Sequence, residues 1–241
     1  MLRVGYITNH MSATATEEYF DLLDEACQPI GRSCPRSEVH ACGYYHKAVH
    51  IWLLCPSTQE VLLQRRALCK DSWAGLWDVS SAGHVSAGEL PLPSALRELE
   101  EELGLSVPGD RLEYVFTHLE KCSSVQKGKP FINNEFQDVY ILCISAKERV
   151  SLDPSKAVLR YDAPSMETRK ESPHPHLSSF ALQASEVSAV QWVPVVELGR
   201  MYRERDPSIV PWDTGEDLNC LLKTFWLKIE ILGCEEKKTH K

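Results

Sequence analysis

The chain has 241 residues, of which 43% are hydrophobic and 25% charged, which is ordinary for one large globular domain or two small ones. Its net charge of −8 argues against a general nucleic-acid binder, which would carry a basic stripe, but not against a nucleotide substrate. No run approaches the ~20 apolar residues of a membrane span, so no membrane partner is predicted. Nine scattered cysteines without a Cys-x-x-Cys pair predict reduced thiols in a cytoplasmic protein, with organelle targeting left open.

Two hairpins and a flexible start are expected in the first part of the chain. Residues 1–16 are polar and are predicted to be a flexible N-terminus. Residues 17–47 are predicted to form a hairpin extension, because a strand candidate over Tyr19–Leu23 is followed by a turn signature. The apolar runs Ala48–Cys55 and Val61–Gln64 flank a turn-like segment and are predicted to form the second hairpin.

The main domain is predicted to span residues 48–232. Within it, residues 152–178 show little apolar periodicity, so a mobile insertion is expected there. Residues 233–241 are predicted to be a charged, frayed tail. The other expected elements are strands over Arg111–Glu120, Phe136–Ser145 and Val187–Val193, and helices over Glu197–Arg203 and Asp217–Leu232. Strands outnumber helices, which favours an α+β fold with helices on a mixed sheet.

The stretch Gly83–Leu105 lies at the centre of the chain, and its second half is predicted to be a helix. Pro91 stands where a helix can begin, and Gly104 stands where one usually ends. Apolar residues recur at helical spacing and define one face: Leu92, Ala95, Leu96, Leu99 and Leu103.

Three carboxylates lie beside that apolar face. Glu98, Glu101 and Glu102 are three and four residues apart, so they share one flank of the helix. Arg97 can offset Glu101 from four residues back, which leaves Glu98 and Glu102 facing each other near the negative end of the helix dipole. A bound divalent cation would resolve this conflict, since hard cations prefer carboxylate oxygens. The alternative is a solvated acidic face.

The spacing of this stretch resembles a known motif. Gly83, five residues, Glu89, seven residues and then Arg97–Leu105 resemble the Nudix box at every fixed position. The resemblance implies an α/β/α sandwich with a mixed sheet. It also implies hydrolysis of a diphosphate linked to another moiety, with Mg²⁺ as cofactor and Mn²⁺ as the alternative.

The resemblance also implies a role for each polar residue of the box. Glu98, Glu101 and Glu102 would be metal ligands, and Glu98 is alternatively the general base. Arg97 would hold the glutamates in place through Glu89, or these two residues form a plain surface ion pair.

The flanks of the box resemble the isopentenyl-diphosphate isomerase branch of the Nudix superfamily. The segments that carry this resemblance are Tyr-Tyr-His-Lys-Ala-Val-His, Leu-Leu-Gln-Arg-Arg-Ala, Trp-Ala-Gly-Leu-Trp-Asp and Ser-Ala-Gly-His. By analogy with that branch, a second metal site would be formed by His40, His46, His84 and Glu135. The alternative is that these histidines are ordinary core or surface residues.

Two departures argue against isomerase activity. Ala82 stands where the isomerases have a catalytic cysteine, and Asn133 replaces their second glutamate. The predicted function is therefore a Mg²⁺-dependent hydrolase acting on a small-molecule diphosphate, either an isoprenoid diphosphate, favoured by the flanks, or a nucleoside diphosphate derivative. The alternatives are an isomerase-like enzyme and a non-catalytic diphosphate sensor.

Arg65 and Arg66 are candidates for binding the substrate phosphate, but strand alternation allows only one of them to face it.

Overall fold

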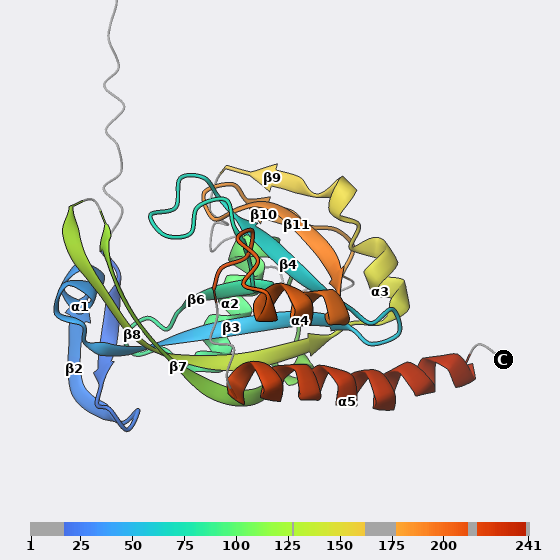
Figure 1. Ribbon diagram of the computed structural model, residues 1–241, viewed down its shortest axis with the longest axis horizontal. Coiled ribbons are helices and arrows are strands. Elements are labelled where there is room, and N and C mark those ends of the chain that lie inside the picture. The colour runs from blue at the N-terminus through green and yellow to red at the C-terminus, as the bar shows by residue number, and fades with distance from the viewer. Residues whose placement is uncertain (1–16, 127, 162–176, 212–215, 240–241) are drawn as a thin grey trace, which may run out of the picture.

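The computed structural model of the protein describes residues 17–126, 128–161, 177–211 and 216–239. The flexible N-terminus predicted over 1–16 therefore lies outside the described residues. Figure 1 shows the elements in chain order. They are β1 (Tyr19–Leu23), β2 (Pro29–Pro35), α1 (Arg36–Cys42), β3 (Tyr45–Cys55), β4 (Glu60–Arg66), β5 (Trp77–Asp78), β6 (Ser81–His84), α2 (Pro91–Leu103), β7 (Leu112–Gln126), β8 (Lys129–Cys143), α3 (Ala146–Ser151), β9 (Val158–Arg160), β10 (Ala181–Gln183), β11 (Val187–Pro194), α4 (Val195–Arg203) and α5 (Glu216–Thr239).

Strand β3 is the centre of a mixed nine-stranded sheet. Along one edge it pairs in parallel with β8, which forms a long antiparallel hairpin with β7. Along its other edge β3 pairs in turn with β1, β6 and β4, all antiparallel. Because β3 and β4 share only the pairs Leu54↔Val61 and Cys55↔Glu60, the two strands diverge beyond their connecting turn. The short strands β5 and β6 lie in the region where they separate.

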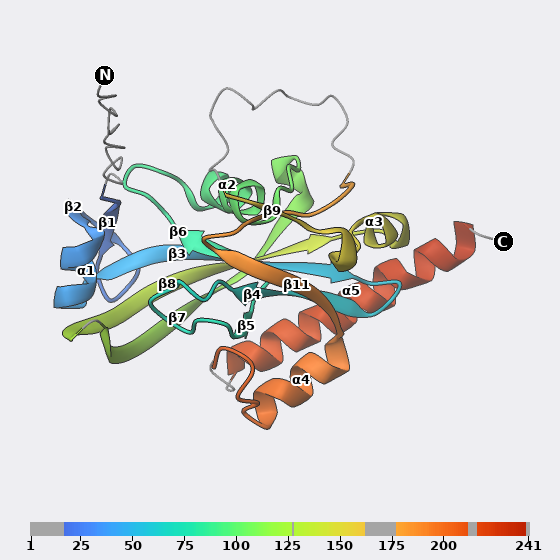
Figure 2. The ribbon, with the colours of Figure 1, turned by 90° about the horizontal axis from the view of Figure 1, so that it is seen from above.

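Helices cover both faces of this sheet, as Figure 2 shows from above. Helix α2 packs on one face, where Ala95, Leu99 and Leu103 join a buried cluster with Val49 and Ile51 of β3. Helices α4 and α5 pack on the opposite face around a second cluster that includes Trp52, Leu221 and Phe225. The alternation of β3 residues between the two clusters follows from the two-residue period of a strand. The expected α/β/α arrangement with a mixed sheet is therefore confirmed.

Helix α2 begins and ends where the sequence predicts. Pro91 occupies its first turn, and Gly104 ends it with a left-handed φ of 71°, a conformation that residues with a side chain rarely adopt. The hairpin of β1 and β2 also forms as expected, and Phe20, Leu22 and Val39 give it a small core of its own. Strand β3 starts at Tyr45, inside the predicted extension over 17–47.

Two segments differ from the expectations. The first part of the insertion predicted over 152–178 contains regular structure within residues 152–161. Leu152 is buried in the core, and β9 pairs in parallel with β10. Residues 162–176 lie outside the described residues. The charged tail predicted from residue 233 continues α5 as far as Thr239, since its glutamates and lysines are good helix formers. No helix within the described residues is long and apolar enough to span a membrane.

Arg160 of β9 holds the C-terminal end of α2. Its Nη2 donates to the backbone oxygens of Glu100 (3.0 Å) and Glu101 (2.8 Å), and its Nε donates to Ala181 O (2.8 Å). The last turn of α2 contains no basic residue of its own. Arg160 therefore supplies the cation that the negative end of this helix favours.

Arg160→Ala is expected to lower the free energy of unfolding by about 1–3 kcal/mol, because hydrogen bonds from a charged donor are lost. In a scanning calorimeter this should lower Tm by roughly 2–4 °C per kcal/mol. Lys156→Ala is the control, since its exposed amine forms an ion pair with Asp153 at 3.4 Å and with no other residue in the described part of the chain. Equal Tm values for the two variants would contradict the role of Arg160.

Candidate functional site

One long open cleft brings the two predicted groups of site residues together. Its lining includes Glu98, Glu101 and Glu102 of α2, and also His40, His84 and Glu135 of the predicted histidine site. The cleft lies beside the separation between β3 and β4. The glutamates come from the helix on one face of the sheet, and strand β6 connects them to the histidine group.

Glu102 is the most firmly held carboxylate of the cleft. Its Oε2 accepts hydrogen bonds from Ser81 Oγ (2.7 Å), the backbone N of Ala82 (3.1 Å) and Gln64 Nε2 (3.2 Å). Its Oε1 accepts none from the described residues. Burial raises the pKa of Glu102 to about 7, although the hydrogen bonds from Ser81 and Ala82 act in the opposite direction. One oxygen is thus fixed in direction and the other is available to a ligand.

Glu98 lies directly against the backbone of β6. A Cβ atom added to Gly83 would come within 2.0 Å of Glu98 Cδ, so only glycine leaves room for this carboxylate. Burial, and then the neighbouring Glu102, raise the pKa of Glu98 well above its usual value. Glu102 is buried, and the neighbouring Glu98 side chain is only 12% exposed. A divalent cation between them would stabilise the ionised form of both carboxyl groups.

Arg97 connects the glutamates to β6. Its Nη1 donates to Glu98 (2.7 Å) and Glu101 (3.2 Å), and its Nη2 donates to His84 O (3.1 Å) and Glu89 (3.4 Å). The expectation that Arg97 would leave Glu98 uncompensated is therefore wrong, because the long side chain folds back across its neighbour. Glu89 also accepts a hydrogen bond from Ser94 Oγ (2.9 Å), so its carboxylate interacts with both Arg97 and the first turn of α2.

Gly83→Ala is expected to lower the rate of the hydrolysis that the box resemblance implies by roughly 10²-fold, since a displacement of about 1 Å at a group that takes part in catalysis has an effect of this size. The new methyl group would push the Glu98 carboxylate off β6. Gly109→Ala is the control, because its Cβ would meet Leu96 at an ordinary 3.5 Å. Steady-state rates with Mg²⁺ measure the effect, and unchanged activity in Gly83→Ala would show that the position of Glu98 is not critical.

Mg²⁺ is expected to stabilise the protein more at pH 8 than at pH 5.5. Without metal, Glu102 binds its proton up to a pKa of about 7, whereas the unfolded chain releases it near 4.5. Stability therefore falls as pH rises through this window, and a bound cation removes that loss. A difference of about 2 kcal/mol would separate the Mg²⁺ and EDTA melting curves by roughly 4–8 °C at pH 8. The same separation at both pH values, or in Glu102→Gln, would count against this account.

The two arginines proposed for phosphate occupy different environments. Arg66 lines the cleft, where it donates to Asp78 (3.0 Å) and to Ser72 O (3.1 Å). Arg65 points away, is exposed and donates to Gly75 O (2.9 Å). Of the two arginines, Arg66 thus belongs to the lining of the cleft and Arg65 does not.

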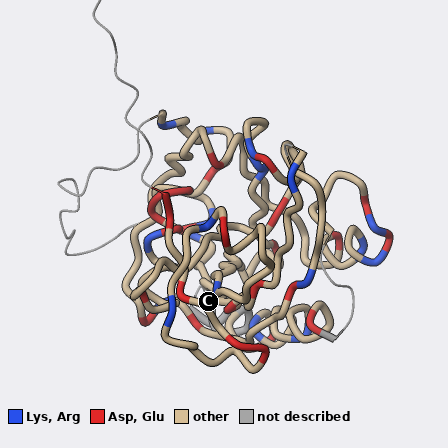
Figure 3. The backbone as a smooth tube through the Cα atoms, turned by 90° about the vertical axis from the view of Figure 1, so that its left-hand side faces the viewer, with Lys and Arg blue, Asp and Glu red and all other residues tan. Residues whose placement is uncertain are grey.

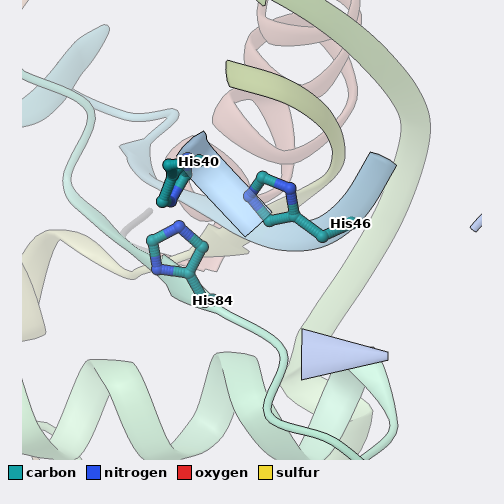
Figure 4. A group of neighbouring side chains, drawn as sticks. All are labelled: His40, His46 and His84. Carbon is teal, nitrogen blue, oxygen red and sulfur yellow. The ribbon is translucent and has the colours of Figure 1, made fainter. Parts of the chain in front are cut away.

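The three histidines converge from three different elements. His40 comes from α1, His46 from β3 and His84 from β6, and Figure 4 shows their rings facing one another. One potential ligand atom from each lies within 4.8 Å of the others. The Nε2 atoms of His40 and His46 are buried and make no hydrogen bond within the described residues. Phe20 stacks on the rings of His46 and His84 and helps to hold them.

Glu135 of β8 completes this group. Its Oε2 lies 3.5 Å from His46 Nε2 and 3.3 Å from His84 Nε2. Burial by itself would raise the pKa of Glu135, but the two imidazoles outweigh it and hold that pKa well below 4.5. Burial lowers the pKa of His40 to about 4 and that of His84 to about 3. At neutral pH His40 and His84 are therefore neutral imidazoles and Glu135 is a carboxylate. Together with the imidazole of His46 they form a donor set that suits a divalent transition metal.

Arg36 of α1 constrains His84. Its Nη1 lies 2.9 Å from His84 Nδ1 and, as an obligate donor, makes that nitrogen an acceptor. The proton of neutral His84 then sits on Nε2, facing Glu135. Ligation of a metal by Nε2 therefore requires Arg36 to release Nδ1.

Figure 3 looks at the end of the molecule that carries α1, and acidic and basic positions are interspersed along its coloured tube. The side chains that line the cleft also carry both signs. They include acidic residues suited to a cation (Glu98, Glu101, Glu102, Glu120 and Glu135) and basic residues suited to a phosphate (Arg36, Arg66, Lys70 and Lys121).

Comparison with known proteins agrees with this geometry. The NUDIX domain family model matches residues 44–213. The chain is 44% identical over 216 residues to Nudix hydrolase 3 of Arabidopsis thaliana, a match that covers 89% of this chain and 24% of that protein. It is 29% identical over 194 residues to an isopentenyl-diphosphate Delta-isomerase of Dinoroseobacter shibae, covering 79% and 85% of the two chains. The chain thus spans about a quarter of the length of its Arabidopsis relative.

A solved structure shows the same fold. The crystal structure of a Deinococcus radiodurans protein superimposes with a TM-score of 0.51 at 18% identity, covering 84% of this chain and 98% of that one. The family match covers most of the chain, including the box and the strands that hold its glutamates. The chain belongs to the NUDIX domain family.

Proposed function

We propose that this chain is a hydrolase that cleaves the diphosphate of a small organic molecule with the help of a divalent cation, Mg²⁺ first and Mn²⁺ as the alternative. The observation that carries the proposal is the complete set of box carboxylates. Glu98, Glu101 and Glu102 line one cleft, Glu102 is buried, and Arg97 and Gly83 hold the carboxylates against β6. Relatives named as Nudix hydrolases support the same activity.

In the proposed reaction a water oxygen attacks one phosphorus, the P–O–P bond breaks, and a carboxylate accepts the proton of the water. A bound divalent cation would neutralise the phosphate charge, orient the group and activate the water. Glu101 and Glu102 would hold the cation. Glu98 would act as the third ligand or take the proton, for which its raised pKa is suited. Arg97 and Glu89 position these carboxylates, and Arg66 reaches the phosphates.

The proposed substrate class is an isoprenoid diphosphate, with a nucleoside diphosphate derivative as the second candidate. Two features favour the first. The flanks of the box match the isomerase branch, and a relative over most of the chain is named isopentenyl-diphosphate Delta-isomerase. The histidine group with Glu135 is the proposed second metal site, and the buried His40 Nε2, which makes no hydrogen bond within the described residues, supports that role. The scattered cysteines favour a cytoplasmic location.

Isomerase activity is the runner-up. Moving a double bond needs a group that donates or accepts a proton, and Ala82 supplies none at the position where the isomerases carry a cysteine. Ala82 lines the cleft next to the histidine group and packs against the cluster under α4 and α5. A non-catalytic sensor is the third candidate, and the retention of all three box glutamates argues against it.

The proposal is tested by incubating the protein with Mg²⁺ and with isoprenoid, nucleoside and nucleotide-sugar diphosphates. Release of phosphate or of a monophosphate ester is followed in time, with EDTA as the control. Metal-dependent release from one class would establish the reaction and name the substrate class. Binding of every diphosphate without turnover would favour the sensor instead.

A further inference from the structure

Gln137 lies directly behind the histidine group and has no role in the box. It follows Glu135 by two residues on β8, so both side chains point to the same face of the sheet. Its side chain is 2% exposed. Its Nε2 donates to Glu135 Oε1 at 2.8 Å and to Glu120 Oε2 at 2.7 Å. The amide group of Gln137 therefore donates one hydrogen bond to each of two carboxylates.

This arrangement gives the two oxygens of Glu135 separate partners. Oε1 accepts from Gln137, while Oε2 faces His46 and His84. A glutamate carboxylate that accepts a fixed hydrogen bond at one oxygen is restricted in its terminal torsion χ3, which otherwise has a broad distribution of angles. The oxygen that faces the imidazoles is thus kept in one direction before any metal arrives.

Glu120 of β7 fixes Gln137 in turn. Glu120 is paired with Glu135 in the register of β7 and β8, and it also accepts from Asn133 Nδ2 at 3.4 Å. Among the described residues, no lysine or arginine forms an ion pair with either glutamate. The neutral amide of Gln137 therefore lies between two neighbouring carboxyl groups and donates a hydrogen bond to each. An apolar side chain in its place could donate none.

We propose that Gln137 is the positioning residue of the histidine metal site: it orients Glu135 as a ligand, and Glu120 anchors it. This inference rests on the proposed second metal site. Outer hydrogen bonds to a ligating carboxylate fix its direction, and their loss typically lowers metal affinity by about 10–100-fold. The proposal extends the site to two residues that do not touch the metal.

The test is titration of the metal-free protein with Mn²⁺ and Co²⁺, for wild type, Gln137→Leu and Gln137→Asn. Leucine removes the amide, and asparagine keeps it on a side chain too short to reach both carboxylates. Glu120→Gln removes the charge of the anchor, and Gln191→Leu at an exposed position of β11 outside the cleft lining is the control for the substitution itself. Affinity for Mn²⁺ is expected to fall about 10–100-fold in both Gln137 variants, less in Glu120→Gln and not at all in the control.

A second readout separates positioning from general destabilisation. The visible d–d absorption of bound Co²⁺ reports the ligand geometry, and it is expected to change in both Gln137 variants at a temperature well below the Tm of each metal-free variant. Wild-type affinity and an unchanged Co²⁺ spectrum in both Gln137 variants would overturn the inference. If wild type and His40→Asn bind the same number of ions, the metal site itself is absent, and both the inference and that part of the proposed function fail.

Discussion

Glu102→Gln is expected to lower the rate of hydrolysis by about 10³-fold, which corresponds to ~4 kcal/mol of the activation barrier. Glutamine keeps the shape of the side chain, and its oxygen can still accept from Ser81 Oγ and the backbone N of Ala82. What it loses is the negative charge that would hold a cation. The fold should therefore survive while the chemistry is lost.

The control for this prediction is Glu100→Gln on the same helix. Glu100 lies one residue before Glu101 but does not line the cleft. Initial rates at saturating Mg²⁺, with Tm measured in EDTA, distinguish a lost ligand from a damaged fold. If Glu102→Gln and Glu100→Gln turn over equally fast, Glu102 is not part of the catalytic site.

The double variant His40→Asn, His84→Asn is expected to lose one bound transition-metal ion. Removing two of the four proposed ligands should lower the metal affinity of that site by at least about 10²-fold. Loss of a residue that only supports a ligand already lowers metal affinity by up to about that factor. Equilibrium dialysis against Mn²⁺ or Zn²⁺ counts the ions, and we expect two per wild-type chain and one in the variant.

Glu102→Gln supplies the complementary control for the histidine variant. It should retain the ion of the histidine group and lose the ion of the α2 glutamates. Together the two variants assign each ion to its own residues. Two ions retained in His40→Asn, His84→Asn would show that the histidines pack without ligating.

The parts of the site that the sequence predicts are those set by local spacing. Residues three and four apart on a helix must share a face, so Glu98, Glu101 and Glu102 could be placed together without a structure. Proline and glycine mark the ends of the same helix through backbone preferences alone. The two-residue period of a strand predicts that Arg65 and Arg66 face opposite ways, and Arg66 is the one that lines the cleft.

The partners of these residues depend on strand register and could not be predicted. Glu102 is held by Gln64 and Ser81, which lie 38 and 21 positions away in the chain. Arg160 reaches the end of α2 from a segment whose composition favoured mobility. Gln137 shares the strand face of Glu135, a signal that alternation offers, but its second contact, to Glu120, follows only from the pairing of β7 with β8.

Two groups of candidate ligands lie in one cleft. The glutamates of α2 suit a hard cation that binds phosphate, and the histidine group suits a transition metal. The proposed hydrolysis would use the first group. Beside the second group this chain has Ala82, whose side chain cannot transfer a proton, at the position where the isomerases carry a cysteine.

The most direct test is to incubate the protein with Mg²⁺ and isopentenyl diphosphate in D₂O and to follow ³¹P and ¹H NMR spectra together, with nucleoside diphosphate derivatives in parallel tubes. Our account predicts that the diphosphate signals of one substrate class are replaced by those of a monophosphate ester and phosphate, and that no deuterium enters the carbon chain. Dimethylallyl diphosphate carrying deuterium would show an isomerase and contradict the account. Intact diphosphates in every tube would contradict it as well.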